Sequence, residues 1–336
     1  LALTGLQQAA AQADNAKLDG RLAGVGRLLG EDLAWLERNI LELARSGLPP
    51  ASDAARHLVA LGGKRVRPMT LLLSAACFDG VSEAARELSM VVELVHSATL
   101  LHDDVIDDGL ERRGARTARL IWGNAVSVLG GDFLLVQALL RTQQHAPELL
   151  PDLLGTLQRL VDGEIVQLRG RAHLDTSEAT YERILHDKTA SLFRFATLAG
   201  ARLGGANVAQ CEPLLDFGEA VGVAFQLVDD ALDYVGEGTG KTLFADLREG
   251  KVTLPLVLAV QDNPTLLPML QKIHQGDESL VLELRQRVAA SGACSEVRRR
   301  AREQTTTALK SLQQLRPSSA RSLLEGVALE LANRSN

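Results

Sequence analysis

Helical periodicity runs along almost the whole of this 336-residue chain and restricts its fold more than any other feature. Apolar residues recur at helical spacings, whereas runs that alternate apolar and polar residues between turn signals are missing. Glycine and proline pairs such as Pro49-Pro50 and Gly204-Gly205 divide the pattern into segments. The helices are predicted at 17–46, 51–61, 68–78, 82–109, 117–143, 148–170, 177–203, 208–235, 252–261, 264–274, 278–290, 294–314 and 318–333. The sequence therefore predicts an all-α fold of about a dozen helices.

No low-complexity linker interrupts this series of helices. We therefore expect a single domain over residues 1–336, with long central helices around a core and a smaller C-terminal helical region at about 262–336. Hydrophobic residues make up 46 % of the chain and charged residues 23 %, which is typical of a soluble globular protein.

Charge and cysteine content argue against several classes of partner. The net charge of −6 argues against a nucleic acid. No unbroken apolar run reaches about 18 residues, so no transmembrane segment is expected, and the N-terminus lacks a signal-peptide pattern. The three cysteines, Cys77, Cys211 and Cys294, lie far apart without metal or redox spacing. Such thiols are typical of a reducing compartment, and a cytoplasmic protein is predicted.

Two clusters of aspartates share the pattern Asp-Asp-x-x-Asp. They consist of Asp103, Asp104 and Asp107, and of Asp229, Asp230 and Asp233. On a helix the first and last aspartate of each cluster lie one turn apart, on one face. Each cluster follows an apolar run, at 91–101 and at 221–228, so each is predicted at the polar end of a mostly buried helix. Two such ends that face one another would form an acidic cleft above an apolar interior.

The chemistry of these clusters favours magnesium and a diphosphate. Carboxylate oxygens without a nearby group of cysteines or histidines suit magnesium better than zinc or copper. Magnesium is usually held by one or two carboxylates together with water and substrate phosphates. A solvated acidic surface is the alternative for either cluster alone, but the repeat at identical spacing behind two buried helices argues against it.

Basic residues that could hold phosphate precede the first cluster. Lys64, Arg65 and Arg67 follow a glycine pair and form a basic loop that enters a helix at Pro68. Guanidinium groups in such a loop can bind phosphate in bidentate fashion, although a basic loop can also be plain surface. His96 lies seven residues before Asp103, on nearly the same helical face, and is either a packed core residue or a phosphate donor.

Further polar candidates follow each cluster. Arg112 and Arg113 come directly after the first one and could neutralise its carboxylates or hold phosphates. The Lys188-Thr189 pair lies inside an apolar helical segment and needs a polar partner there. Gln226 precedes Asp229 by three residues and shares its face, whereas Lys241 belongs to a glycine-rich segment that is either a lid over the cleft or a plain loop.

In this order and spacing the motifs resemble the trans-type (E-type) polyprenyl diphosphate synthases over nearly the whole chain, and in particular medium- and long-chain members such as octaprenyl diphosphate synthases. The matching stretches are Gly62-Gly63-Lys64-Arg65-Val66-Arg67-Pro68, Glu93 to Arg113, Gly163-Glu164 with Gln167, Lys188-Thr189, Phe225 to Asp233, and Lys241 through Glu249-Gly250-Lys251 to Pro255.

The resemblance implies a fold, a reaction and an assembly. The fold would be the isoprenoid synthase fold, with its helices around a central cavity. The reaction would be the Mg²⁺-dependent head-to-tail condensation of isopentenyl diphosphate with an allylic diphosphate, such as farnesyl or geranylgeranyl diphosphate. About three Mg²⁺ ions would bind with the substrate diphosphate. The assembly would be a homodimer, with the N-terminal helix at about 1–46 in the dimer contact, and the product could pass to a membrane.

The resemblance also implies residue roles, position by position. Metal binding falls to Asp103, Asp107 and Asp229, with Asp104, Asp230 and Asp233 supporting them, and Lys188 joins these six as catalytic. Isopentenyl diphosphate falls to Lys64, Arg67, His96 and Arg113, and the allylic diphosphate to Arg112, Lys188, Thr189, Gln226 and Lys241. Phe244 replaces a glycine of the family pattern after the lid lysine, and Asp108 is an additional acid beside the first cluster.

Product length is predicted from the wall of the helix that precedes Asp103. Val95, Ala98 and Thr99 are small or medium in size, and each helical turn adds about 5.4 Å of depth. Without a bulky residue there, we expect a product of at least about twenty carbons, and in particular one of about thirty to fifty. A short-chain farnesyl or geranylgeranyl diphosphate synthase is the alternative. The basic loop argues against a terpene cyclase or a head-to-head synthase, and two intact clusters argue against a non-catalytic subunit that only binds prenyl diphosphates.

Overall fold

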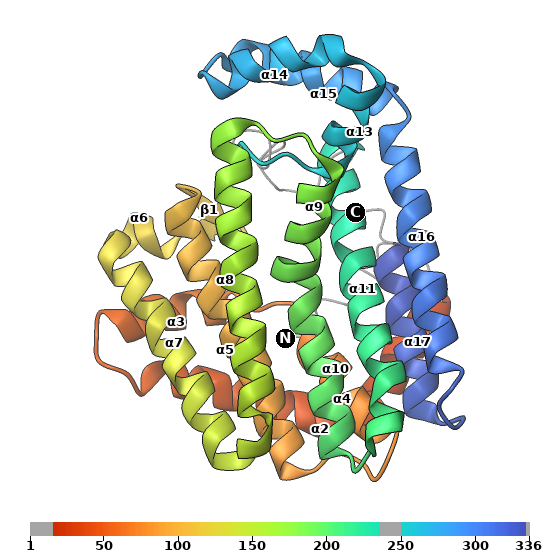
Figure 1. Ribbon diagram of the computed structural model, residues 1–336. Coiled ribbons are helices and arrows are strands. Elements are labelled where there is room, and N and C mark those ends of the chain that lie inside the picture. Colours follow the sequence, from red (N-terminus) through yellow and green to blue (C-terminus); the bar gives the residue numbers. More distant parts are fainter. Residues whose placement is uncertain (1–15, 236–249, 334–336) are drawn as a thin grey trace. The chain divides into compact units, whose positions relative to one another are not determined.

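The computed structural model describes residues 16–235 and 250–333, with side chains from residue 24 onward, and it is built almost entirely of helices (Figure 1). The first half of the chain forms α2 (Ala16–Arg45), α3 (Ala51–Ala60), α4 (Val66–Ala76), α5 (Glu83–Ile106), β1 (Glu111–Arg112), β2 (Ala115–Arg116), α6 (Ala118–Trp122), α7 (Asn124–His145), η1 (Pro147–Leu149) and α8 (Leu150–His173). The second half forms α9 (Glu178–Ile184), η2 (Leu185–Ala190), α10 (Ser191–Leu203), α11 (Val208–Val235), α13 (Leu254–Asp262), η3 (Pro264–Leu266), α14 (Leu267–His274), η4 (Glu278–Leu280), α15 (Val281–Ala290), α16 (Ala293–Leu312) and α17 (Ser319–Ala332). The predicted all-α class is confirmed.

The chain divides into two compact units, each built from separate stretches of sequence. Unit 1 comprises the chain up to Leu153, together with Phe195–Leu215 and Gln313–Val327. Unit 2 comprises Leu154–Arg194, Asp216–Leu312 and the chain from Ala328. The single domain expected from the sequence stays a prediction.

In unit 1, α5 is the central helix and packs against α2, α3, α4 and α7. Ser82 begins α5 by accepting a hydrogen bond from the backbone of Ala85, and apolar residues such as Leu88, Val92 and Val95 are buried along its length. Gly131 lets α7 approach closely, because a Cβ at this position would lie 2.3 Å from Nε2 of His102. The tight packing fixes the helix that carries the first aspartate cluster.

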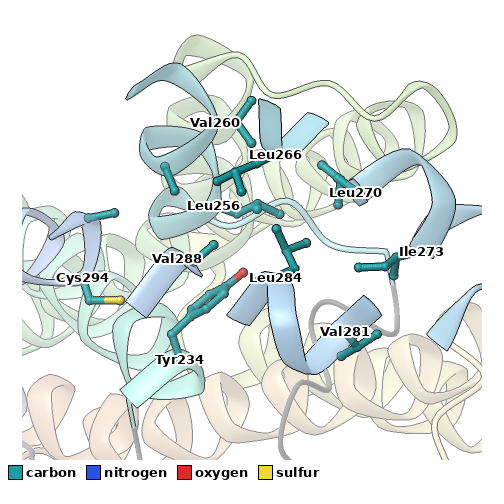
Figure 2. Close-up of a cluster of buried hydrophobic side chains, with 12 residues drawn as sticks. Tyr234, Leu256, Val260, Leu266, Leu270, Ile273, Val281, Leu284, Val288 and Cys294 are labelled. Atoms are coloured by element: carbon teal, nitrogen blue, oxygen red, sulfur yellow. The ribbon is translucent and has the colours of Figure 1, made fainter. Parts of the chain in front are cut away.

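In unit 2, the end of α11 is embedded in an apolar core. Tyr234 is almost fully buried and lies in a cluster of side chains from α13, α14, α15 and α16 that includes Leu256, Leu284, Val288 and Cys294 (Figure 2). A second cluster buries α9, η2 and the preceding turns of α11 against α13 and α16. The helix that carries the second aspartate cluster is therefore anchored at its C-terminal end.

Apart from shifts of one to three residues at other helix ends, the structure differs from the predicted helices at three places. The segment 117–143 is broken at Gly123, whose φ of 87° is a conformation that glycine adopts without strain. The segment 82–109 ends at Ile106, and a hairpin of β1 and β2 follows, with Arg113 and Gly114 at positive φ in its turn. The segment 177–203 contains the π-helical turn η2. At each of these places the sequence keeps a helical pattern, although the backbone leaves regular α-helical geometry.

One described helix, α7, is long and apolar enough to cross a membrane by length and composition alone. Core helices of soluble proteins pass the same test, and 33 % of the most apolar window of α7 is buried in the structure. The rest presents apolar side chains outward, among them Leu129, Val136 and Leu140, each more than half exposed.

Candidate active site

The first aspartate cluster lies at the C-terminal end of α5. Asp103 and Asp104 belong to its last turn, and Asp107 caps the helix, its backbone N–H donating to the carbonyl of Asp103 at 2.8 Å. Carboxylates at this end face the negative pole of the helix dipole, which is unfavourable without nearby cations. The cluster is therefore poised to attract positive charge.

The hairpin after α5 brings a cation back to this cluster. Arg112 donates from Nε and Nη2 to Oδ1 of Asp104, at 3.0 Å and 2.6 Å. Burial raises the pKa of Asp104, and Arg112 opposes that rise. Arg112 thus forms the local ion pair in this structure, and its binding of phosphates stays a prediction. Asp108 is mostly exposed and pairs with Arg119 at 2.6 Å.

The basic loop is organised by Arg65, a residue to which the sequence assigned no separate role. Arg65 precedes α4 in the left-handed conformation, with φ of 49°. Its buried guanidinium donates to Glu37 at 2.9 Å and forms a second ion pair with Glu93 of α5. Although burial disfavours its charge, Glu93 and Glu37 hold the pKa of Arg65 above its ordinary value. The partly exposed residues Lys64 and Arg67 lie on either side of this anchor along the chain.

His96 lies within electrostatic reach of several arginines. Burial, followed by the charges of Arg67, Arg113 and Arg112, holds its pKa well below the ordinary value, so the imidazole is neutral at neutral pH. The guanidinium of Arg113 lies against Gly63, where a Cβ would be 3.1 Å from its Nη2. Unit 1 thus gathers Arg67, His96, Arg112 and Arg113 around one region, as a site for a polyanion requires.

The second aspartate cluster lies in the last turns of α11. Asp230 is 2 % exposed, and its Oδ2 accepts a hydrogen bond from the hydroxyl of Tyr181 at 2.6 Å. Its Oδ1 accepts from Nε2 of Gln226 at 2.8 Å, and Oε1 of Gln226 in turn accepts from Oγ1 of Thr189 at 3.0 Å. Asp229 and Asp233 are partly exposed. Two predicted substrate-binding residues therefore belong to one hydrogen-bonded chain with this cluster.

Lys188 is positioned by the π-helical turn η2, where an extra residue per turn changes the direction of the side chains. It forms an ion pair with Glu164 of α8. Gly163 permits the close approach of α8, because a Cβ there would lie 2.9 Å from the backbone nitrogen of Lys188. The same turn is tied to α8 by Arg159, which donates to Asp187 at 2.8 Å.

The predicted product wall lies on α5 as expected for helical residues. Val95 and Ala98 are buried, and the hydroxyl of Thr99 donates to the backbone oxygen of His96 at 2.8 Å. Lys241 and Phe244 lie outside the described residues. The prediction that the two aspartate clusters face one another stays a prediction, as does the role of each candidate site residue.

Sequence analysis assigned no role to four side chains that hold candidate site residues in place. Tyr181, Glu164, Glu93 and Glu37 contact Asp230, Lys188 and Arg65 from helices remote in sequence. Glu93 and Glu164 carried a usable signal, since both stand in the motif stretches quoted above, and Glu93 also precedes His96 by one helical turn and shares its face.

The donor set of this site fits magnesium. No group of three or more His, Cys, Asp or Glu side chains in the described part of the chain forms a metal cage by itself. Magnesium is ordinarily bound by one or two carboxylates, and phosphates and water complete its shell. The carboxylates of Asp103 and Asp107 in unit 1, and that of Asp229 in unit 2, are each donors of the type that this mode of binding uses.

The fold and the motifs are shared with characterised proteins. The chain matches the polyprenyl synthetase family over residues 49–289. It is 36 % identical to octaprenyl diphosphate synthase of Escherichia coli, over 91 % of this chain and 97 % of that protein. It is 37 % identical to a geranyl-diphosphate-specific all-trans-nonaprenyl-diphosphate synthase of Rhodobacter capsulatus, over 88 % of this chain and 93 % of that protein.

A solved structure agrees with these sequence matches. The polyprenyl synthase of Caulobacter crescentus, determined with calcium and isoprenyl diphosphate, superposes with a TM-score of 0.88 at 36 % identity, over 94 % of this chain and 98 % of that one. Fold and motifs together define an all-helical class of prenyltransferase. The chain belongs to the polyprenyl synthetase family. The isoprenoid synthase fold and the predicted class, a medium- or long-chain trans-polyprenyl diphosphate synthase, are confirmed.

Proposed function

We propose that this protein elongates an allylic diphosphate with isopentenyl diphosphate in a magnesium-dependent, head-to-tail reaction. The observation that carries the proposal is the gathering of Arg67, His96, Arg112 and Arg113 in the unit that also holds the first aspartate cluster. Such a pair of clusters suits two diphosphates. The carboxylates would bind the one that arrives with metal ions, and the cations would bind the one that arrives without them.

Isopentenyl diphosphate binds to the basic group formed by Lys64, Arg67, His96 and Arg113. Guanidinium and ammonium groups neutralise its phosphates directly. Because His96 is neutral in the substrate-free protein, it donates a single ring N–H without adding another charge to a crowded cationic site. Arg65 keeps the loop in place through its buried pairs with Glu37 and Glu93.

Asp103, Asp107 and Asp229 would hold the Mg²⁺ that accompanies the allylic diphosphate, and Lys188 and Lys241 would bind its phosphates. Magnesium supplies charge that neutralises the leaving diphosphate. Thr189, Gln226 and Arg112 orient this group, while Asp104, Asp230 and Asp233 support the metal-binding residues. Such preorganised electrostatic stabilisation lowers the barrier to breaking the carbon–oxygen bond.

The chemical step needs no dedicated base from the protein. The allylic carbon–oxygen bond breaks, and its electron pair leaves with the diphosphate. The double bond of isopentenyl diphosphate then attacks the allylic cation and forms the new carbon–carbon bond. The released diphosphate takes the proton from the adjacent carbon, which restores a double bond. Apolar side chains that exclude water protect the cation from hydrolysis.

The product is of medium or long chain length because the α5 wall above Asp103 carries only small or medium side chains, Val95, Ala98 and Thr99. The test is to incubate the protein with labelled isopentenyl diphosphate, Mg²⁺ and geranyl, farnesyl or geranylgeranyl diphosphate, and to size the dephosphorylated products. Products of about thirty to fifty carbons support the proposal. Accumulation of fifteen- or twenty-carbon products would establish the short-chain alternative instead, and absence of transfer with every primer would overturn the function.

The working assembly is a homodimer, and two apolar faces support this part of the proposal. Leu129, Val136 and Leu140 form an exposed stripe along α7. On α8, Val161, Ile165 and Leu168 are exposed at spacings of four and three residues, which places them on one side of that helix. Faces of this kind are covered in stable oligomers.

Light scattering after gel filtration tests the assembly. The wild type is expected at twice the chain mass of 36.1 kDa, and a Val136→Glu/Leu140→Glu variant is expected to shift toward the monomer. A monomeric wild type would refute the dimer. The apolar stripe of α2, by contrast, already packs within unit 1 against α3, α4 and α5, so a role of the N-terminal helix in the dimer stays a prediction. We place the enzyme in the cytoplasm, from which its water-insoluble product passes to a membrane.

A further inference from the structure

The hydrogen bonds of Asp230 set it apart from its neighbours in the second cluster. Its side chain is 2 % exposed, and both carboxylate oxygens accept hydrogen bonds. One donor, Tyr181, comes from α9, and the other, Gln226, lies one turn earlier on α11. A buried carboxylate with both oxygens engaged is a fixed acceptor rather than a ligand facing solvent.

The two donors belong to a longer chain of hydrogen bonds. Thr189 donates to the amide oxygen of Gln226, and the amide nitrogen of Gln226 donates to Asp230. The orientation of the Gln226 amide is set by Asp230, since a flipped amide would place its oxygen against a carboxylate, whereas the hydroxyl of Thr189 can donate or accept. The hydroxyl of Tyr181 closes the chain at the far oxygen of Asp230.

We propose that Tyr181 is a positioning residue for the second aspartate cluster and for Gln226, and that it acts through Asp230. This inference rests on the proposed function, because Asp229 and Gln226 are the groups that would meet the metal and the allylic diphosphate. Tyr181 itself does not touch substrate. Its hydroxyl fixes the rotamer of Asp230, which in turn fixes Gln226 and the last turns of α11.

The ring of Tyr181 has a separate, structural task. It is 7 % exposed and belongs to the buried cluster with Leu227, Val228 and Ala231 of α11. A Tyr181→Phe substitution keeps this packing and removes only the hydroxyl. The result is a buried carboxylate oxygen without its donor, a change that ordinarily disturbs the group left behind more than it disturbs the fold.

The chain offers a matched control, since it contains two tyrosines in all, Tyr181 and Tyr234. Tyr234 lies on α11 and is also buried, at 1 % exposed, and its hydroxyl accepts from Thr253 at 3.3 Å. Figure 2 shows its ring among the apolar side chains of α13 and α15. Tyr234→Phe therefore removes the same group from the same unit without removing a donor from Asp230.

Steady-state kinetics provides the first test. Tyr181→Phe is expected to lower kcat/KM for the allylic diphosphate about tenfold and to raise the half-saturating Mg²⁺ concentration, while KM for isopentenyl diphosphate stays within about twofold. Tyr234→Phe is expected to match the wild type in all three. In an Asp230→Asn background, Tyr181→Phe should lower kcat/KM little further, because both substitutions disrupt the same hydrogen bond between Tyr181 and Asp230. Equal effects of both tyrosine variants, or additive losses with Asp230→Asn, would overturn the proposal.

A spectroscopic test does not depend on turnover. Tyrosine labelled with ¹³C at Cζ gives two signals in the wild type, which the spectrum of Tyr234→Phe assigns. Mg²⁺ with inorganic diphosphate is expected to shift the Tyr181 signal and to leave the Tyr234 signal in place. If the Tyr181 signal does not shift with Mg²⁺ and inorganic diphosphate, Tyr181 is not coupled to the second aspartate cluster. This outcome refutes the proposal even if Tyr181→Phe fails to fold. Loss of all prenyl transfer by the wild type would instead refute the proposed function, whatever the tyrosine signals do.

Discussion

The two aspartate clusters share a sequence pattern and a place at a helix end, but their central carboxylates are satisfied by different chemistry. Asp104 at the end of α5 is paired with a guanidinium, that of Arg112. Asp230 near the end of α11 accepts hydrogen bonds from two uncharged donors, Tyr181 and Gln226. In both clusters the central aspartate is buried. The two clusters therefore share a buried central carboxylate, and the surrounding helices decide how its charge is balanced.

The largest expected effect tests what the clusters have in common. Asp103→Asn and Asp229→Asn should each lower kcat by about 100-fold or more, because each removes a carboxylate that binds metal in the proposed reaction. Incorporation of labelled isopentenyl diphosphate measures the loss. Asp108→Asn is the matched control, since this acid is 79 % exposed and pairs with Arg119 rather than lying in the cluster. An Asp229→Asn enzyme with near-normal turnover would show that the second cluster has no catalytic task.

A second pair of substitutions compares α5 with α11, the two helices that carry the clusters. Ala98 lies five residues before Asp103, and Ala224 lies five residues before Asp229. Ala98→Phe should shorten the product, because a ring on α5 closes the predicted wall at about one turn above the cluster. Ala224→Phe should leave product length unchanged. The sized products of both variants check this, and an unaltered product from Ala98→Phe would show that the wall lies elsewhere.

The sequence predicted the helices and the clusters because both depend on local pattern. Apolar spacing placed α11 at the same residues as the structure does, and the Asp-Asp-x-x-Asp motifs need only a helix to form. The contacts of Tyr181 with Asp230 and of Glu164 with Lys188 depend on tertiary packing and on the π-helical turn η2. Periodicity along the chain cannot reveal such contacts, since each joins helices whose register is set only when they pack.

The pairing of Arg112 with Asp104 provides a smaller effect that is specific to the first cluster. Arg112→Gln leaves a buried carboxylate without its guanidinium and should lower the free energy of unfolding by about 1–3 kcal/mol at neutral pH. Burial already raises the pKa of Asp104, and loss of Arg112 should raise it further.

The pH dependence of this variant follows from the raised pKa of Asp104. A carboxyl group that binds its proton more tightly in the folded state destabilises the fold above its folded pKa, and this cost disappears below its unfolded pKa of about 4. The stability difference between Arg112→Gln and the wild type should therefore shrink as the pH falls, which urea unfolding across a pH series measures. Tyr181→Phe removes no charge partner from Asp230 and should show a weaker dependence. A constant difference for Arg112→Gln would mean that Asp104 stays ionised in both states.

The smallest expected effect compares two histidines, one in each unit. Burial and arginines depress the pKa of His96, whereas Glu219, which accepts at 2.8 Å, raises the pKa of His186 in unit 2. A raised pKa means that His186 stabilises the fold fully below its unfolded pKa of about 6.5, and that this contribution is lost as the pH rises through the folded pKa. Because His186 is 44 % exposed, solvent screening limits the effect to about 0.5 kcal/mol. His186→Gln should therefore be destabilised at about pH 5.5 and equal to the wild type at about pH 8.5 in thermal unfolding. Arg194 also pairs with Glu219, at 2.9 Å. In an Arg194→Gln variant that keeps His186, the contribution of His186 to stability should therefore depend more strongly on pH. If that dependence disappears instead, the pairing of His186 with Glu219 is not the cause of the raised pKa.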